Sequence, residues 1–161
     1  MLPYKKVVFV CHSNEALSIM AEAIMNHLQE KLPAERRVYA VSRGLVVLFS
    51  APINPKVATV IEKNGLKLLR ENTLELTRDD LSEDALIVAI NSKEKKMIED
   101  KYPGVMNLYE LRDFSGEGGE ITEPYGGSLE DYETIFEHID LMIKLMIEKI
   151  WPKEAEKAKE E

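Results

Sequence analysis

The stretch Val8-Phe9-Val10-Cys11-His12-Ser13-Asn14-Glu15-Ala16-Leu17-Ser18 decides the fold and contains the candidate site. Residues 6–10 form a short apolar run, which is typical of a buried parallel strand. After the loop, apolar residues recur at helical spacing and predict a helix over about residues 16–31. These residues are Leu17, Met20, Ala21, Ile24 and Leu28. Because ligands bind at the carboxyl ends of strands in an open parallel sheet, the pattern predicts a site around Cys11.

Strands and helices alternate along the rest of the chain. The further predicted strands are 37–42, 85–90 and 105–108, and the further predicted helices are 54–65, 92–102 and one from Ser128 onward. Residues 114–127 are rich in glycine, acidic residues and proline, and they predict a long loop. This alternation predicts a three-layer α/β/α fold around a four-stranded parallel sheet.

The length and composition fit one folded unit. The chain has 161 residues, of which 45% are apolar, and this is enough for one sizeable core. No internal repeat or interdomain linker interrupts it. We therefore expect a single domain over residues 1–152, followed by a charged tail over residues 153–161. With no apolar stripe left unburied, a monomer is expected.

Charge and cysteine content exclude several classes of function. The formal net charge of -8 gives a nucleic-acid partner no electrostatic support. No apolar stretch is long enough to span a membrane, and the N-terminus lacks the apolar segment of a signal peptide. Cys11 is the single cysteine, so no internal disulfide can form, and a cytoplasmic location is expected. The spacing of His27 and His138 is not that of metal ligands, and we expect neither a metal nor a cofactor.

Cys11 has two interpretations from its position alone. A thiol beside a helix N-terminus has a lowered pKa and can act as a nucleophilic thiolate, next to a site that favours anions. Alternatively, the cysteine is buried and serves as a small hydrophobic residue.

Three motifs resemble those of one enzyme family. In the loop and helix, the matching residues are Cys11, Asn14, Ser18, Met20, Ala21, Glu22 and Ala23, without gaps. Ser42-Arg43-Gly44 and Glu123-Pro124-Tyr125 supply a second and a third match. Over residues 5–150 the chain resembles the low-molecular-weight protein tyrosine phosphatases, in particular the bacterial branch that includes protein arginine phosphatases.

The resemblance implies a role for each matching residue. Cys11 would attack phosphorus, Ser18 would hydrogen-bond the thiolate, and Glu123 would act as general acid and base. Asn14 would brace the loop, against Ser42. The substrate and anion site implied in this way comprises His12, Ser13, Asn14, Glu15, Ala16, Leu17, Ser42 and Tyr125.

Three positions depart from the family pattern. Leu17 stands where the family has an arginine that grips the phosphoryl oxygens through two charge-assisted hydrogen bonds. Leu17 also fits the apolar stripe of its helix, so packing alone can explain it. Glu15 places a carboxylate in the loop, which would repel a phosphate dianion and raise the pKa of the cysteine, unless it points to solvent or caps the helix. Glu123 replaces an aspartate and keeps the carboxyl group. Arg43 is a candidate substitute for the missing charge, and an exposed side chain is the alternative there.

Three functions follow from these residues. The first is cysteine-dependent hydrolysis of a phosphotyrosine or phosphoarginine protein, or of a small phosphomonoester, impaired by the loss of the loop arginine. The second is a catalytically inactive family member that acts as a binding or regulatory protein. The third, a thiol-dependent arsenate reductase, needs further cysteines, and Cys11 has none to pair with.

Overall fold

A parallel sheet of four strands organises the structure. The computed structural model describes residues 4–68, 70–116 and 120–150, so the predicted tail at 153–161 lies outside the described residues. The strands are β1 (Lys6–Cys11), β2 (Tyr39–Gly44), β3 (Ala85–Ala89) and β4 (Leu108–Glu110). All neighbours pair in parallel, in the order β2-β1-β3-β4. The predicted four-stranded parallel sheet is confirmed.

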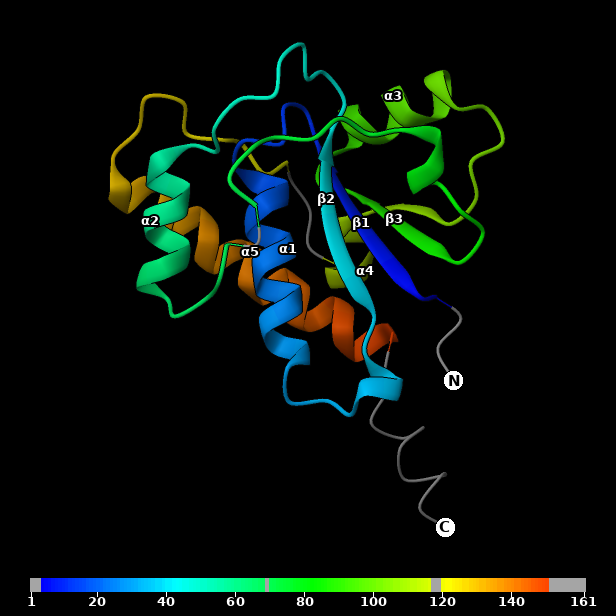
Figure 1. Ribbon diagram of the computed structural model, residues 1–161, viewed down its shortest axis with the longest axis horizontal. Helices are drawn as coiled ribbons and strands as arrows, with labels where there is room; N and C mark the ends of the chain where they lie inside the picture. Colours follow the sequence, from blue (N-terminus) through cyan, green and yellow to red (C-terminus); the bar gives the residue numbers. More distant parts are fainter. Residues whose placement is uncertain (1–3, 69, 117–119, 151–161) are drawn as a thin grey trace.

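Helices cover both faces of the sheet (Figure 1). Val7, Phe9 and Cys11 of β1 face a core shared with α1 (Leu17–Gln29), α2 (Pro55–Lys63) and α5 (Leu129–Ile150). Val8 and Val10 face the opposite core, which is closed by α3 (Ser92–Lys101). Alternate side chains of β1 therefore pack into two separate cores, one on each face of the sheet. The predicted three-layer architecture is confirmed.

Two helices begin where their capping residues predict. The Asn54 side chain accepts a hydrogen bond from the backbone N–H of Lys56 at 2.9 Å, and Pro55 occupies the first turn of α2. At the start of α5, the Ser128 side chain accepts the backbone N–H of Asp131 at 3.2 Å, and the Asp131 side chain accepts the backbone N–H of Ser128 at 2.9 Å.

Several boundaries differ from the prediction, and β2 spans Tyr39–Gly44 rather than residues 37–42. The fourth strand begins at Leu108 rather than at residue 105, because Asn107 adopts a left-handed conformation (φ 56°) that interrupts the extended backbone. A short helix, α4 (Leu111–Ser115), extends into the predicted loop; a reciprocal capping box between Glu110 and Asp113 stabilises its start. In α3, Asn91 is the N-cap and Ser92 the first helical residue, so this helix begins at the predicted residue.

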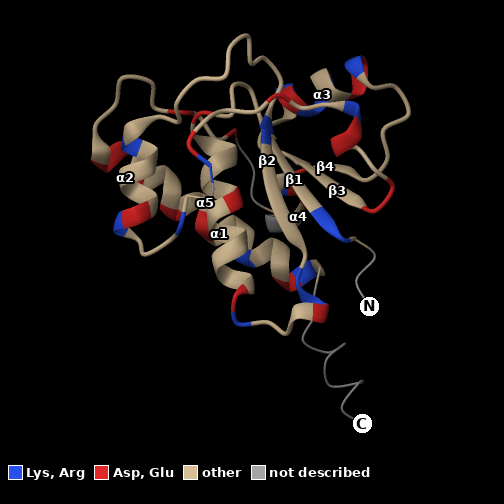
Figure 2. Cartoon of the chain, viewed as in Figure 1, with Lys and Arg blue, Asp and Glu red and all other residues tan. Residues whose placement is uncertain are grey.

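Charge is spread over the molecule. Figure 2 shows basic and acidic residues interspersed on α2, α3 and the connections around them. Within the described residues, none of the helices combines the length and the hydropathy that a membrane span requires.

Candidate active site

The loop after β1 places Cys11 against the start of α1. Cys11 is the last residue of β1, and Leu17 is the first of α1. The N-cap residue of this helix is Ala16, which provides no side-chain cap. The loop packs closely on the end of β2, because a Cβ atom on Gly44 would lie 2.7 Å from the Ser13 carbonyl carbon. The close approach explains why a residue without a side chain occupies position 44.

The Cys11 thiol is buried and hydrogen-bonded. Its sulfur lies 2.9 Å from Ser18 Oγ, as the resemblance implies for a residue that supports a thiolate. Burial raises the pKa of Cys11, and this effect outweighs the hydrogen bonds from Ser18 and from the backbone of Asn14. The charge of Glu123 raises the pKa further. The lowered pKa expected from the helix N-terminus is therefore wrong for this thiol, and the carboxylate that acts on it is Glu123.

A buried network of hydrogen bonds stabilises the loop between β1 and α1. Asn14 is fully buried with a positive φ of 61°, and its amide donates to Ser18 Oγ at 2.8 Å and Ser42 Oγ at 3.1 Å. Asn14 Oδ1 accepts the backbone N–H of Leu74 at 3.0 Å. The expected contact between Asn14 and Ser42 is present. Because both residues are used in this network, they lie behind the pocket rather than on its wall.

Arg70 completes this network and was missed by the sequence analysis. Its Nη2 donates to Ser42 Oγ at 2.8 Å and to Asn14 Oδ1 at 3.2 Å, and lies 3.7 Å from the buried Glu22 carboxylate. Burial raises the pKa of Glu22, and the charge of Arg70 opposes that rise. Arg70 thus sits under the loop, on the side away from the pocket.

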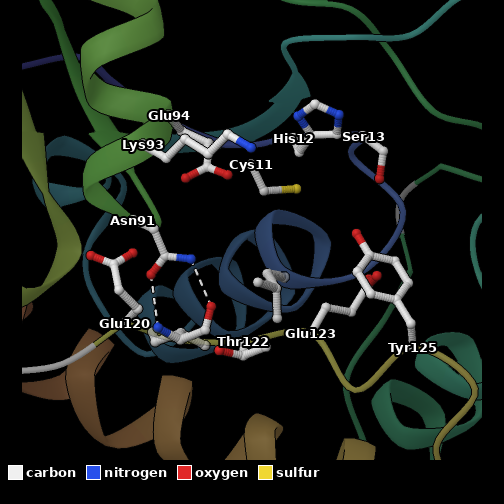
Figure 3. A pocket seen from close by; sticks show the side chains of 12 residues that line it. Cys11, His12, Ser13, Asn91, Lys93, Glu94, Glu120, Thr122, Glu123 and Tyr125 are labelled. Atoms are coloured by element: carbon white, nitrogen blue, oxygen red, sulfur yellow. Dashed lines mark hydrogen bonds between the residues drawn. The ribbon is translucent and has the colours of Figure 1, made fainter.

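A pocket of about 310 Å³ opens beside the cysteine (Figure 3). Six of the predicted site residues line it: Cys11, His12, Ser13, Leu17, Glu123 and Tyr125. The side chain of Ser18 reaches this group through the cysteine sulfur. Glu15 and Ala16, by contrast, are not among the lining residues, because Glu15 is half-buried beside the loop and Ala16 packs in the core.

The long connection after α4 brings Glu123 to the pocket. Asn91 holds this segment by two hydrogen bonds to the backbone of Ile121, at 2.6 and 2.8 Å, which Figure 3 shows as dashed lines. Burial raises the pKa of Glu123, while a hydrogen bond from Tyr125 lowers it and the charge of Glu15 raises it again. Burial and the same hydrogen bond raise the pKa of Tyr125 to about 12. Sequence reasoning did not find Asn91.

The pocket carries more acidic than basic groups. Its lining includes three carboxylates, Glu94, Glu120 and Glu123, against Lys93 and His12. Glu120 is partly compensated, since Arg112 lies 3.5 Å from its carboxylate and Ser92 donates to it. No group of three or more His, Cys, Asp or Glu side chains in the described part of the chain could hold a metal ion.

Arg43, the candidate substitute for the missing arginine, does not line the pocket. Leu17 is 7% exposed and belongs both to the pocket lining and to the core of α1, as its place in the apolar stripe predicts. Arg43 forms an ion pair with Asp80 at 3.2 Å and donates to the Ser42 carbonyl, so it is neither exposed nor aimed at Cys11. Of the described residues that line the pocket, none is an arginine.

Comparisons with known proteins agree with this geometry. The family model described as low molecular weight phosphotyrosine protein phosphatase matches residues 6–157. The low molecular weight protein-tyrosine-phosphatase PtpB of Staphylococcus haemolyticus is 29% identical over 140 residues, which cover 86% of this chain and 94% of that protein. A protein-arginine-phosphatase of Geobacillus stearothermophilus is 26% identical over 151 residues, covering 92% of this chain and 97% of that protein.

Solved structures show the same architecture. A low molecular weight protein tyrosine phosphatase from T. tengcongensis superimposes with a TM-score of 0.80 at 28% identity, covering 89% of this chain and 98% of that chain. The YwlE arginine phosphatase of Geobacillus stearothermophilus gives a TM-score of 0.82 at 24% identity, covering 94% and 96%, and supports the fold. With the matched family model and the cysteine loop described above, these likenesses establish that the chain belongs to the low molecular weight phosphotyrosine protein phosphatase family.

Proposed function

We propose that this protein is a cysteine-dependent phosphatase whose hydrolysis of phosphotyrosine or phosphoarginine on proteins is strongly impaired. The observation that carries the proposal is Leu17, an apolar side chain on the pocket wall where the family pattern has an arginine. The rest of the machinery implied by the resemblance is in reach of the same pocket.

The proposed reaction has two steps. The Cys11 thiolate attacks phosphorus, the bond from phosphorus to the leaving atom breaks, and protonated Glu123 gives its proton to the leaving group. Glu123, now a carboxylate, then takes a proton from water, which attacks the phosphocysteine and releases phosphate and the thiolate. The raised pKa of Glu123 suits its first role, because it keeps more of the protonated acid available near neutral pH.

Two features of the pocket oppose this chemistry. The raised pKa of Cys11 leaves only a small fraction of thiolate at neutral pH, and the thiolate is the nucleophile. The carboxylates of Glu94, Glu120 and Glu123 repel a phosphate dianion that has no arginine to hold it. Weak hydrolysis is the consequence.

The second candidate, a family member that binds a partner without hydrolysis, is favoured by the acidic lining of the pocket. Hydrolysis of an aryl phosphate by wild type and Cys11→Ser separates the two. Slow turnover that Cys11→Ser abolishes supports the impaired phosphatase, and a wild-type rate equal to that of Cys11→Ser supports the binding protein. Robust turnover, at the level of an arginine-containing family member measured in parallel, would contradict both.

A further inference from the structure

One oxygen of the buried Glu94 carboxylate has no hydrogen-bond partner at the pocket among the described residues. The Glu94 side chain is held on α3, the residue is 8% exposed, and Oε2 has no hydrogen-bond partner in the described structure. Figure 3 shows the carboxyl group of Glu94 pointing into the pocket, on the side where Cys11 lies. An unsatisfied buried carboxylate is costly, so this oxygen points to a donor that arrives with a ligand.

Two further carboxylates, Glu120 and Glu123, line the pocket at different places. Glu123 lies on the opposite side of the pocket from Glu94 (Figure 3), whereas the Glu120 carboxylate accepts a hydrogen bond from Ser92 of α3, the helix that carries Glu94. Burial and the charge of Glu120 both raise the pKa of Glu94, while a hydrogen bond from its own backbone N–H and the charges of His12 and Lys93 oppose the rise. A cation beside Glu94 would give its free oxygen a partner and would offset the charge of the neighbouring Glu120.

We propose that this pocket binds a guanidinium group without phosphate, in the place where other family members hold an anion. The carboxylates do not converge as metal ligands do among the described residues, which disfavours a compact metal ion. A guanidinium has five N–H donors in a planar fork and can reach carboxylates on separate walls, whereas an ammonium is a point charge.

The apolar part of the lining fits the rest of an arginine side chain. Leu17 and Ile121 can contact its methylene groups, and the ring of Tyr125 lies at the mouth of the pocket, where a guanidinium can stack. A volume of about 310 Å³ admits one such side chain. The proposal goes beyond the proposed function and does not depend on residual hydrolysis, because it concerns an arginine that carries no phosphoryl group.

Calorimetric titration tests the proposal with N-acetyl-arginine methylamide and its citrulline counterpart, a neutral ligand of nearly the same shape. Wild type is expected to bind the arginine compound and to show no saturable binding of the citrulline compound. Glu94→Gln keeps the shape of the side chain and is expected to weaken arginine binding by on the order of tenfold, the loss of one charge-assisted contact. Glu99→Gln makes the same change on an exposed position of the same helix and should leave the affinity unchanged.

Further ligands distinguish a free amino acid from an arginine within a protein, and they define the results that would overturn the proposal. Free arginine and the tripeptide Gly-Arg-Gly, compared with the methylamide, distinguish an amino-acid ligand from an arginine within a protein, and tight binding of either supports the proposal. Equal binding of the citrulline compound, no effect of Glu94→Gln, or tighter binding of inorganic phosphate than of arginine would overturn it. The proposed phosphatase activity is tested with an aryl phosphate and Cys11→Ser, whereas arginine binding is tested with Glu94→Gln. Either hypothesis can therefore fail without the other.

Discussion

Replacing Leu17 with arginine should convert a weak phosphatase into an effective one. Leu17 lines a cavity of about 310 Å³, so a longer side chain at this position can extend into free space instead of being forced into the core. The neighbouring parts of the site stay in place, because Asn14, Ser42 and Arg70 hold the loop from the opposite side. The substitution therefore adds the missing group to a preformed site.

The size of the gain follows from two hydrogen bonds. Charge-assisted hydrogen bonds between a guanidinium and phosphoryl oxygens contribute roughly 1.5–3 kcal/mol each, or about 3–6 kcal/mol for the pair. If they act mainly in the transition state, this corresponds to a rate increase of about 10²–10⁴. Glu94 and Glu123 compete for the new guanidinium, so the lower end of this range is expected.

The assay is hydrolysis of p-nitrophenyl phosphate at saturating and limiting substrate. Leu17→Met keeps an apolar side chain of similar volume and should leave the rate unchanged, and Leu17→Lys, with a charge but no fork, should gain less than Leu17→Arg. Addition of Cys11→Ser to Leu17→Arg should abolish the gain. A folded Leu17→Arg protein with the wild-type rate would refute the reasoning, since the arginine would then not be the limiting loss.

Three other perturbations test the construction of the site. Asn14→Ala should lower the free energy of unfolding in urea by about 2–4 kcal/mol, because it leaves several buried polar groups unsatisfied and removes a residue suited to positive φ. If the unfolding midpoint does not move, the network does not stabilise the loop. Gly44→Ala should cost about 1–3 kcal/mol, since its Cβ would meet the Ser13 backbone at 2.7 Å, and an unchanged stability would argue against that close approach. The Cys11 thiol should react with iodoacetamide with a midpoint above its ordinary pKa, and Glu123→Gln should lower that midpoint by removing a negative charge. Because the unfolded state loses this proton first, stability should fall as pH rises from the ordinary thiol pKa through the folded one, and Cys11→Ser should flatten that fall. A midpoint below the ordinary value would contradict the burial argument.

The sequence allowed most of the fold to be predicted, because strong local patterns carry it. The apolar run of β1 and the stripe of α1 each extend over several residues, and Asn54 and Ser128 cap their helices by contacts within three residues. The segment around β4 and α4 lacked such a pattern. A single left-handed Asn107 moved the start of β4, and α4 is only five residues long.

The site was predicted in part for the same reason. Cys11 and Ser18 lie seven residues apart, within one loop and helix, and their contact follows from the family motif. Arg70 reaches Asn14 across 56 residues, and Asn91 reaches Ile121 across 30. No local spacing signals such contacts, because they depend on how the connections fold over the end of the sheet. The sequence left the direction of the pKa shift of Cys11 open, because a helix N-terminus lowers the pKa of a thiol whereas burial and a nearby carboxylate raise it.

Titration of the wild-type protein with inorganic phosphate, followed by calorimetry, tests the central claim most directly. The central claim is that the loop after Cys11 binds a phosphoryl group only weakly, because Leu17 stands in the place of an arginine. We predict no saturable binding below about 10 mM phosphate for wild type and saturable binding at lower concentration for Leu17→Arg. Saturable binding of phosphate to wild type with a dissociation constant well below about 1 mM would contradict the account.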